Sequence, residues 1–434
     1  MVESISPADL KKRRRLILSS YLGNLIEWYD FGIYAYLGTA VFDKIFFPKM
    51  SAAAGLVAVM GLFAVGFIAR PLGALLFGYF GDRVGRKPMM VMALTLMGVA
   101  AVLMGLCPTY SQIGLAAPVL MMILRFTQGL AIGGESSGGP LLALESTPSE
   151  RRGYFASLVW SGAAAAVILS SSSSLLVSML PVHDMLTWGW RIPYLASSVA
   201  IVVAVYMQRS IDESPIFLAA IAKAAPSKAP VVDVIRNEGK SLVIVILCAA
   251  AALACIYLLG TFGFSYAVAT LHLNRTAMLG GVLAGGVIHQ FATPLAGHVS
   301  DKIGRRTVMA TCFVAAVLYG FLEYFVLLPS GSLFLAAMGI ALANGILTGS
   351  IGAMEVSFYS ELFRDTRLRF TGSALGKQTG SAIGGLLPLA AAGLLSMNGS
   401  VLLSIMVPLI LFCIVGLGAI FWAEETHKLS LEHG

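Results

Sequence analysis

The chain has 434 residues, of which 58% are hydrophobic and only 12% are charged, and its formal net charge is +7. A soluble core of this length cannot bury so much apolar surface, so the composition excludes an ordinary soluble protein and indicates that lipid is part of the solvent. The basic balance raises the alternative of nucleic-acid binding, which is disfavoured because most of the 29 Lys and Arg residues lie in the termini and in alternate loops.

Apolar segments long enough to cross a membrane recur along the chain. A helix needs about 20 apolar residues to cross a hydrocarbon layer roughly 30 Å thick. The runs are continuous and do not alternate, which excludes a transmembrane β-barrel. The twelve predicted helices span residues 16–40, 52–80, 88–107, 112–144, 153–180, 189–209, 241–267, 276–299, 307–328, 332–360, 370–395 and 400–423. The sequence therefore predicts an all-α membrane protein.

Basic residues gather on one side of these helices. Five of them lie between Lys11 and Arg15, and most others fall in alternate loops, whereas only Lys44, Lys49 and Arg275 lie in the loops of the other side. The positive-inside rule then places both termini in the cytoplasm. The first apolar run is too long for a cleaved signal peptide, so we expect a retained first helix.

The first predicted helix carries two carboxylates within an apolar run. Glu27 and Asp30 are three residues apart and share a helix face, and Tyr34, further along the same segment, is a candidate substrate contact. Ionisable groups inside membrane helices are costly and mark pathways for solutes or protons. Either carboxylate is a candidate proton carrier. The alternative is a structural pair satisfied by the backbone or by arginine partners.

The loop after the second predicted helix returns later in the chain. G-Y-F-G-D-R-V-G-R-K at 78–87 reappears 219 residues later as G-H-V-S-D-K-I-G-R-R at 297–306. A second set of landmarks, Glu145 with Arg151 and Glu361 with Arg367, repeats with an offset of 216 residues. The sequence therefore predicts an internal duplication.

Each repeated loop places an aspartate at the end of a helix. Such a carboxylate can accept hydrogen bonds from its loop arginine and from the positive end of a neighbouring helix. We therefore expect gating latches made by Asp82 with Arg86 and by Asp301 with Arg305. The alternative is that these charges serve only as topology signals.

The duplication divides the chain into two bundles of six helices. The predicted parts are a basic cytoplasmic N-terminus (1–15), a first bundle (16–209), a cytoplasmic linker (210–240), a second bundle (241–423) and a cytoplasmic tail (424–434). Two bundles packed around a central cavity are the scheme of secondary transporters.

The fourth predicted helix carries Arg125 near its middle and Glu135 ten residues later. A planar, always-charged guanidinium there suits a carboxylate, whether of a substrate or of Glu27 or Asp30. Competition between the two would link protonation to substrate binding. Glu135 lies about 15 Å further along the helix and is expected to be a second proton relay or an inner gate, with helix packing as the alternative.

The second bundle adds further polar groups. His289 in the eighth predicted helix, and Lys377 with Gln378 in the eleventh, are expected to contact an acidic substrate, although His289 can also be an interior packing residue. Glu355 is a candidate partner for Lys377. Glu323 lies toward the outer end of its helix, where its side chain can reach the surface.

Four further motifs carry a resemblance to a known family. They are G-N-L-I-E-W-Y-D-F at 23–31, R-F-T-Q-G-L-A-I-G-G-E at 125–135, W-G-W-R-I-P-Y at 188–194 and S-E-L-F at 360–363. Together with the repeated loop they resemble the metabolite:proton symporter subfamily of the major facilitator superfamily, over nearly the whole chain. The resemblance implies proton-coupled uptake of acids such as citrate, α-ketoglutarate or shikimate, or of proline and betaine.

The same resemblance implies a gating charge cluster. In the family such a cluster ties two helices together, which assigns Glu145 and Arg152 to gating and, through the repeat, Glu361 and Arg367. Lys377 stands where many members have an aromatic residue, and this departure bears on the substrate.

No phosphate loop, zinc spacing or nucleophile elbow occurs in the sequence, so we expect no enzyme activity, cofactor or metal. The expected function is a monomeric symporter that uses the proton gradient to import a small organic acid across a bacterial cytoplasmic membrane, with no nucleic-acid partner. Two alternatives stay open: a symporter of a zwitterionic osmolyte or amino acid, and a non-transporting nutrient receptor.

Overall fold

The computed structural model describes residues 7–84, 86–135, 149–209 and 230–428, with Leu144 and Thr147, and every regular element in this part of the chain is a helix. The N-terminal half contains α1 (Pro7–Leu37), η1 (Gly38–Phe42), α2 (Asp43–Phe46), α3 (Ala52–Val84), α4 (Arg86–Leu106), α5 (Tyr110–Ile113), α6 (Ala116–Glu135), η2 (Ser149–Arg151), α8 (Arg152–Ser178), α9 (Val182–Asp184), η3 (Met185–Gly189) and α10 (Arg191–Arg209). The C-terminal half contains α12 (Pro230–Asn237), α13 (Gly239–Cys255), η4 (Ile256–Phe262), α14 (Gly263–Ala269), α15 (Arg275–Ile303), α16 (Arg305–Leu322), η5 (Glu323–Leu327), η6 (Leu328–Ser330), α17 (Leu333–Leu342), η7 (Ala343–Leu347), α18 (Thr348–Glu361), α19 (Thr366–Gly385), α20 (Leu387–Asn398), η8 (Leu402–Met406) and α21 (Val407–Trp422).

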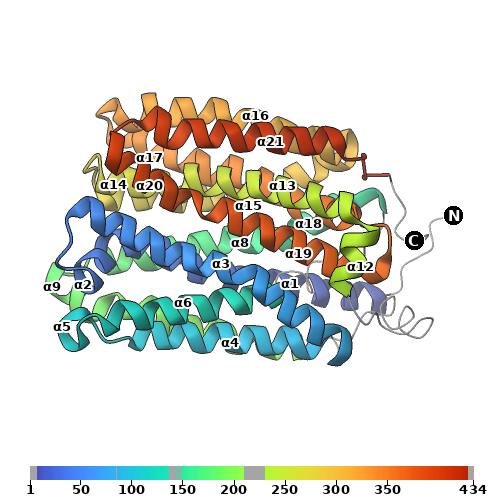
Figure 1. Ribbon diagram of the computed structural model, residues 1–434, viewed down its shortest axis with the longest axis horizontal. Coiled ribbons are helices and arrows are strands. Elements are labelled where there is room, and N and C mark those ends of the chain that lie inside the picture. Colours follow the sequence, from blue (N-terminus) through green and yellow to red (C-terminus); the bar gives the residue numbers. More distant parts are fainter. Residues whose placement is uncertain are drawn as a thin grey trace.

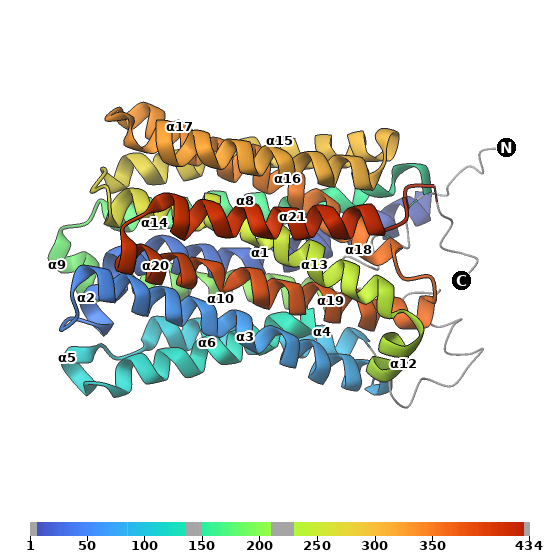
Figure 2. The same ribbon diagram turned by 45° about the horizontal axis from the view of Figure 1, so that its top comes forward.

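The long helices run side by side along the longest axis of the molecule (Figures 1 and 2). The two halves meet along a seam, where α8 packs against α15 and α18, and α3 packs against α19 and α20. We call the end of the bundle where α1 begins and α21 ends the gate end, and the opposite end, with α2, α9 and α14, the far end (Figure 1). The seam brings residues of both halves together in the interior.

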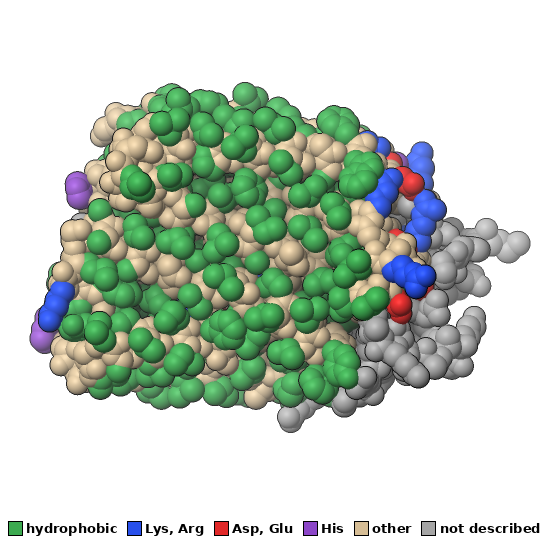
Figure 3. Space-filling view, viewed as in Figure 1, with side chains coloured by type: hydrophobic (Ala, Val, Ile, Leu, Met, Phe, Trp, Pro, Cys, Tyr) green, Lys and Arg blue, Asp and Glu red, His purple; other side chains and the backbone are tan. Residues whose placement is uncertain are grey.

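The surface has the pattern of a membrane protein. Hydrophobic side chains cover the broad side of the molecule, and charged side chains appear at its two ends (Figure 3). Within the described residues, ten helices are long and apolar enough to cross a membrane. The other two predicted spans fall on α1 and α10, whose side chains the structure describes only in part. The prediction of an all-α membrane protein is confirmed.

Small residues let α3 and α6 approach closely. A Cβ added at Gly129 would lie 2.1 Å from the carbonyl oxygen of Gly66, and one at Gly73 would lie 2.1 Å from that of Leu130. Only glycine fits at such contacts between helix backbones. This approach sets α3 and α6 side by side in the bundle interior.

The boundaries of some predicted helices differ from the structure. The described residues include six π-helical turns, at η1, η3, η4, η5, η7 and η8, which the apolar pattern does not reveal. The predicted linker 210–240 includes α12, while residues 210–229 lie outside the described part of the chain.

Candidate functional site

A buried ion pair joins the first two long helices. Glu27 on α1 lies 3.8 Å from Arg70 on α3, and each side chain is less than 5% exposed. The Arg70 guanidinium also lies over the rings of Phe31 and Phe67, 4.5 and 4.3 Å from their centroids. Cation–π contacts of this kind hold a charge in place where water is excluded.

Arg125 on α6 reaches Asp30 on α1 through an intervening amide. Its Nη1 donates to Oε1 of Gln128 at 2.7 Å, and Nε2 of Gln128 donates to Oδ2 of Asp30 at 3.0 Å. All three side chains are fully buried. The guanidinium also stacks on the Tyr34 ring, 3.5 Å from its centroid.

This network differs from the predicted one in two ways. Arg125 makes no direct ion pair with either carboxylate of α1, and Glu27 and Asp30 contact different helices although they are three residues apart. Nε and Nη2 of Arg125 and Oδ1 of Asp30 make no hydrogen bond to the protein. Two spare donors on one planar group are what a carboxylate needs for a bidentate contact.

A second buried ion pair comes from the C-terminal half. Nζ of Lys377 on α19 lies 3.4 Å from Oε2 of Glu355 on α18, which is the pairing that the sequence predicts. The same ammonium group lies 5.0 Å from the ring centroid of Trp160, which belongs to α8 of the other half. Glu355 is also within electrostatic reach of Glu27 and Arg70.

Aromatic rings fill the space between the two ion pairs. Trp28 packs edge-on against Trp160, with centroids 5.3 Å apart, and stacks on Tyr257 of η4 at 6.2 Å. The indole N–H groups of both tryptophans and the hydroxyl of Tyr257 are buried without a hydrogen-bond partner. Buried polar groups are normally satisfied, and the described part of the protein supplies no partner for these three.

We call these residues together the central cluster: Glu27, Trp28, Arg70, Trp160, Tyr257, Glu355 and Lys377. It joins both halves across the seam.

Other predicted site residues lie elsewhere. His289 lies on α15, is fully buried and faces α18, where a Cβ added at Gly349 would lie 2.9 Å from its ring. Neither nitrogen of the His289 ring has a hydrogen-bond partner. Gln378 is fully buried on α19. Glu323 is fully buried too, so the expectation that its side chain reaches the surface was wrong.

A latch crosses the seam at the gate end. The Asp301 carboxylate accepts hydrogen bonds from the backbone N–H groups of Gly153 and Tyr154, at 2.8 and 2.9 Å, and from Nη1 of Arg305 at 2.8 Å. Arg305 in turn pairs with Glu361 of α18 at 3.3 Å. The aspartate thus meets its loop arginine and the start of α8, as the sequence predicts for this loop.

The side chains of Asp82, Arg86, Glu135, Glu145 and Arg367 lie outside the described part of the structure. Arg152, at the start of α8, is buried and within electrostatic reach of Glu361.

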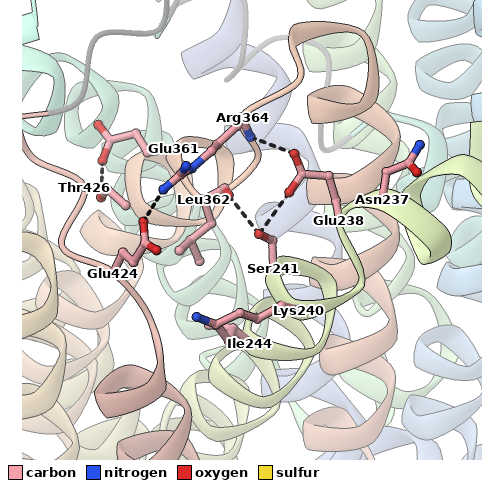
Figure 4. Close-up of a pocket in the computed structure, with 10 residues that line it drawn as sticks. All are labelled: Asn237, Glu238, Lys240, Ser241, Ile244, Glu361, Leu362, Arg364, Glu424 and Thr426. Carbon is pink, nitrogen blue, oxygen red and sulfur yellow. Dashed lines mark hydrogen bonds and ion pairs between the residues drawn. The ribbon is translucent and has the colours of Figure 1, made fainter. Parts of the chain in front are cut away.

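A small pocket of about 220 Å³ adjoins this latch (Figure 4). Its walls are tied by hydrogen bonds: Thr426 donates to Glu361 at 2.6 Å, and Glu238 accepts from the backbone N–H of Arg364 at 3.1 Å. The segment after α21 and the turn before α13 therefore brace the end of α18.

Comparison with known proteins identifies the family. A family model described as "Sugar (and other) transporter" matches residues 16–242. The chain is 33% identical over 375 residues to the shikimate transporter of Escherichia coli, covering 85% of each chain. The chain belongs to the major facilitator superfamily.

Other members of the superfamily give the same picture. The inner membrane metabolite transport protein YhjE of Escherichia coli is 33% identical over 84% of each chain, and the proline/betaine transporter of that organism is 28% identical over 81% of this chain and 72% of its own. The fold matches that of the proton:xylose symporter XylE, with a TM-score of 0.77, 16% identity and 98% coverage of both chains. The chain is thus a multi-pass protein of the inner membrane.

Arg70 and Gln128 were not predicted as site residues of this superfamily member. Arg70 is a lone charge within an apolar span, which is a usable signal. Gln128 is neutral, and only its spacing of three residues from Arg125 hinted at a contact on the same helix face.

Proposed function

We propose that the chain is a proton-coupled symporter that imports a small organic acid by alternating access. The observation that carries the proposal is the central cluster, in which a buried cation–carboxylate pair from each half meets across the seam. Taking two charges out of water costs free energy that their mutual attraction often does not repay. Two such pairs in the interior therefore suggest a role beyond stability. Here each cation can exchange its internal carboxylate for that of a substrate.

Proton coupling follows from this exchange. A substrate carboxylate that binds Arg70 competes with Glu27. One that binds the free Nε and Nη2 of Arg125 offsets the positive charge that reaches Asp30 through Gln128. The carboxylate of the protein is then stable in the interior only when it takes up a proton. Release of the substrate on the other side lets the carboxylate reclaim its cation and lose the proton. Tyr34, stacked on Arg125, holds that guanidinium in place during the exchange.

The proposed architecture is that of two six-helix bundles, 16–209 and 241–423, related by duplication and joined by a cytoplasmic linker at 210–240. The gate end then faces the cytoplasm, with both termini, in keeping with the basic loops. The charged loops Asp82–Arg86 and Asp301–Arg305, with Glu145, Arg152, Glu361 and Arg367, gate this end. Glu135, His289, Lys377 and Gln378 complete the proposed pathway of a functional monomer.

A second candidate function is symport of a zwitterionic osmolyte. Tyr257, whose ring stacks on that of Trp28, lies within electrostatic reach of Glu27 and Glu355, and aromatic rings with nearby carboxylates suit a quaternary ammonium group. The likeness to a proline/betaine transporter supports the same candidate.

Uptake into proteoliposomes separates the candidates. Labelled shikimate, citrate, α-ketoglutarate, proline and betaine are offered with and without an inward proton gradient. We expect the gradient to drive accumulation of one of the acids and of neither zwitterion. Accumulation of betaine or proline alone would favour the second candidate, and indifference of every solute to the gradient would contradict proton symport.

A further inference from the structure

A larger pocket, of about 420 Å³, lies at the far end of the bundle. Its walls come from both halves, with α2, α3, α8 and η3 on one side of the seam and α14 and α15 on the other. The pocket therefore lies at the place where the seam would open toward the far end. It is distinct from the central cluster, with which it shares no residue.

The far end of the bundle has few basic residues, and most of them line this pocket. Of the three basic residues in the far-end loops, Lys44 and Arg275 line the pocket, together with His272. One carboxylate, Asp43, is also in the lining. The third basic residue, Lys49, instead lies 5.7 Å from the ring centroid of Tyr110.

Arg275 crosses the seam through one hydrogen bond and one contact with sulfur. Its Nη2 donates to the carbonyl oxygen of Tyr36 on α1 at 3.0 Å, and its Nη1 lies 3.6 Å from the thioether sulfur of Met185. Its Nε is buried without a hydrogen-bond partner. In the described part of the chain no carboxylate lies within ion-pair distance of this guanidinium.

We propose that this pocket is an anion-binding vestibule, in which Lys44 and Arg275 receive the carboxylate of a small organic acid, and that this binding releases Arg275 from Tyr36 and frees the far end of the seam. The guanidinium is charged in either case, but its present acceptors are a neutral carbonyl and a thioether, which is a weak acceptor, whereas a carboxylate is charged and accepts two N–H bonds at once. The carboxylate thus displaces both present partners of the guanidinium. The proposal rests on the proposed function in one respect, that the far end faces the side from which substrate arrives.

The charge of the pocket can be tested without transport. His272 is exposed in the lining, whereas all five native cysteines are buried, so His272→Cys places one reactive thiol there. The thiol is labelled with an anionic and with a cationic methanethiosulfonate of similar size, and the ratio of the two rates is measured. We expect the ratio to fall about tenfold when Lys44→Gln and Arg275→Gln are added, because positive charge in a pocket concentrates anions. Lys49→Gln, which removes one positive charge outside the pocket, is the control for each single substitution and should leave the ratio nearly unchanged.

Binding is tested on the same thiol with citrate as the probe. Citrate should slow labelling by the anionic reagent more than sodium chloride does at equal ionic strength, and this protection should vanish in the Lys44→Gln, Arg275→Gln variant. An equal ratio in all variants, or equal slowing by citrate and chloride, overturns the vestibule. Proton-driven uptake with unchanged labelling ratios would refute the vestibule alone, whereas a charge-dependent ratio in a protein that transports none of the five solutes would refute only the symport proposal.

Discussion

Asp301 binds the backbone N–H of Gly153 across the seam, at 2.8 Å. The carboxylate belongs to α15 of the C-terminal half and the N–H to the first turns of α8 in the N-terminal half. A negative charge at a helix N-terminus gains from the helix dipole as well as from the hydrogen bonds. Because the partners lie in opposite halves, we expect the contact to break if the two halves separate at the gate end.

Asp301→Asn should loosen the gate end. The substitution keeps the shape of the side chain but removes the charge that two backbone N–H groups and Arg305 share, at a cost of about 1–2 kcal/mol. Conformations open at this end should become about tenfold more populated. Ser157 faces Gly297 within the α8–α15 contact, so labelling of a Ser157→Cys thiol reports the opening.

The control for this experiment is Glu424→Gln, which removes an exposed carboxylate paired with Arg364 at the same end. Exposed ion pairs contribute little, so labelling should stay at the rate of the parent protein. Equal labelling of the Asp301→Asn and parent proteins would show that the latch does not hold the seam.

Arg125→Gln should abolish concentrative uptake and leave a folded protein. The amide can still bond to Gln128, but it lacks the fixed charge and the fork that a carboxylate binds. Arg125→Lys should keep only part of the activity because an ammonium group cannot make the bidentate contact. Uptake and size-exclusion elution are measured together, with the exposed Arg236→Gln as the matched control. Normal uptake by Arg125→Gln would remove Arg125 from the mechanism.

The sequence predicted the helices, and the pair of Glu355 with Lys377, because both signals are strong along the chain itself. Long apolar runs define spans, and two opposite charges isolated in different spans must find partners. The amide bridge by Gln128 could not be predicted, since a neutral residue leaves no comparable signal. The sequence shows how far along its helix Glu323 lies but not which way its side chain points. For this reason Glu323 was predicted to reach the surface, although it is buried.

Loss of one partner of the Glu355–Lys377 pair should destabilise the fold. Glu355→Gln leaves the Lys377 ammonium buried to a large degree without an opposite charge, which typically costs about 3 kcal/mol. Adding Lys377→Met should recover most of that loss, since an apolar side chain needs no partner. Thermal unfolding in detergent measures both variants. A double variant less stable than Glu355→Gln would mean that Lys377 is held by Trp160 and not by Glu355.

Gly352→Ala should disturb the seam at the central cluster. A Cβ at Gly352 on α18 would lie 1.8 Å from Nε1 of Trp160 on α8, so α8 and α18 would have to move apart. Overpacking of this kind costs about 1–3 kcal/mol. Gly280→Ala is the matched control, because its Cβ would meet no atom within 4 Å and alanine favours the helix. Similar melting temperatures for the two variants would show that the seam absorbs the methyl group.

Acid should weaken the attachment of the segment after α21 through Glu425. Burial favours the protonated form of this carboxyl, but hydrogen bonds from the backbone N–H groups of Arg305, His427 and Arg306 outweigh it, and the pKa of Glu425 lies below its usual value of 4.5. A pKa that is lower in the folded than in the unfolded chain gives stability that is present above pH 4.5 and is lost as the pH falls through the folded-state pKa.

Glu425→Gln should therefore be less stable than the parent protein at neutral pH by an amount that shrinks on acidification. Melting temperatures of both proteins are measured from pH 7 downward through the usual pKa of 4.5. The gap between them should be constant at first and should close below that pH, because the parent carboxylate then takes up a proton and also loses its charge. Glu424→Gln, next in the chain but exposed, should show little gap at any pH. If the difference in melting temperature instead widened with acid, the pKa of Glu425 would be raised and not lowered by folding. The carboxyl would then be held better by the backbone of Arg305 and Arg306 when it is protonated.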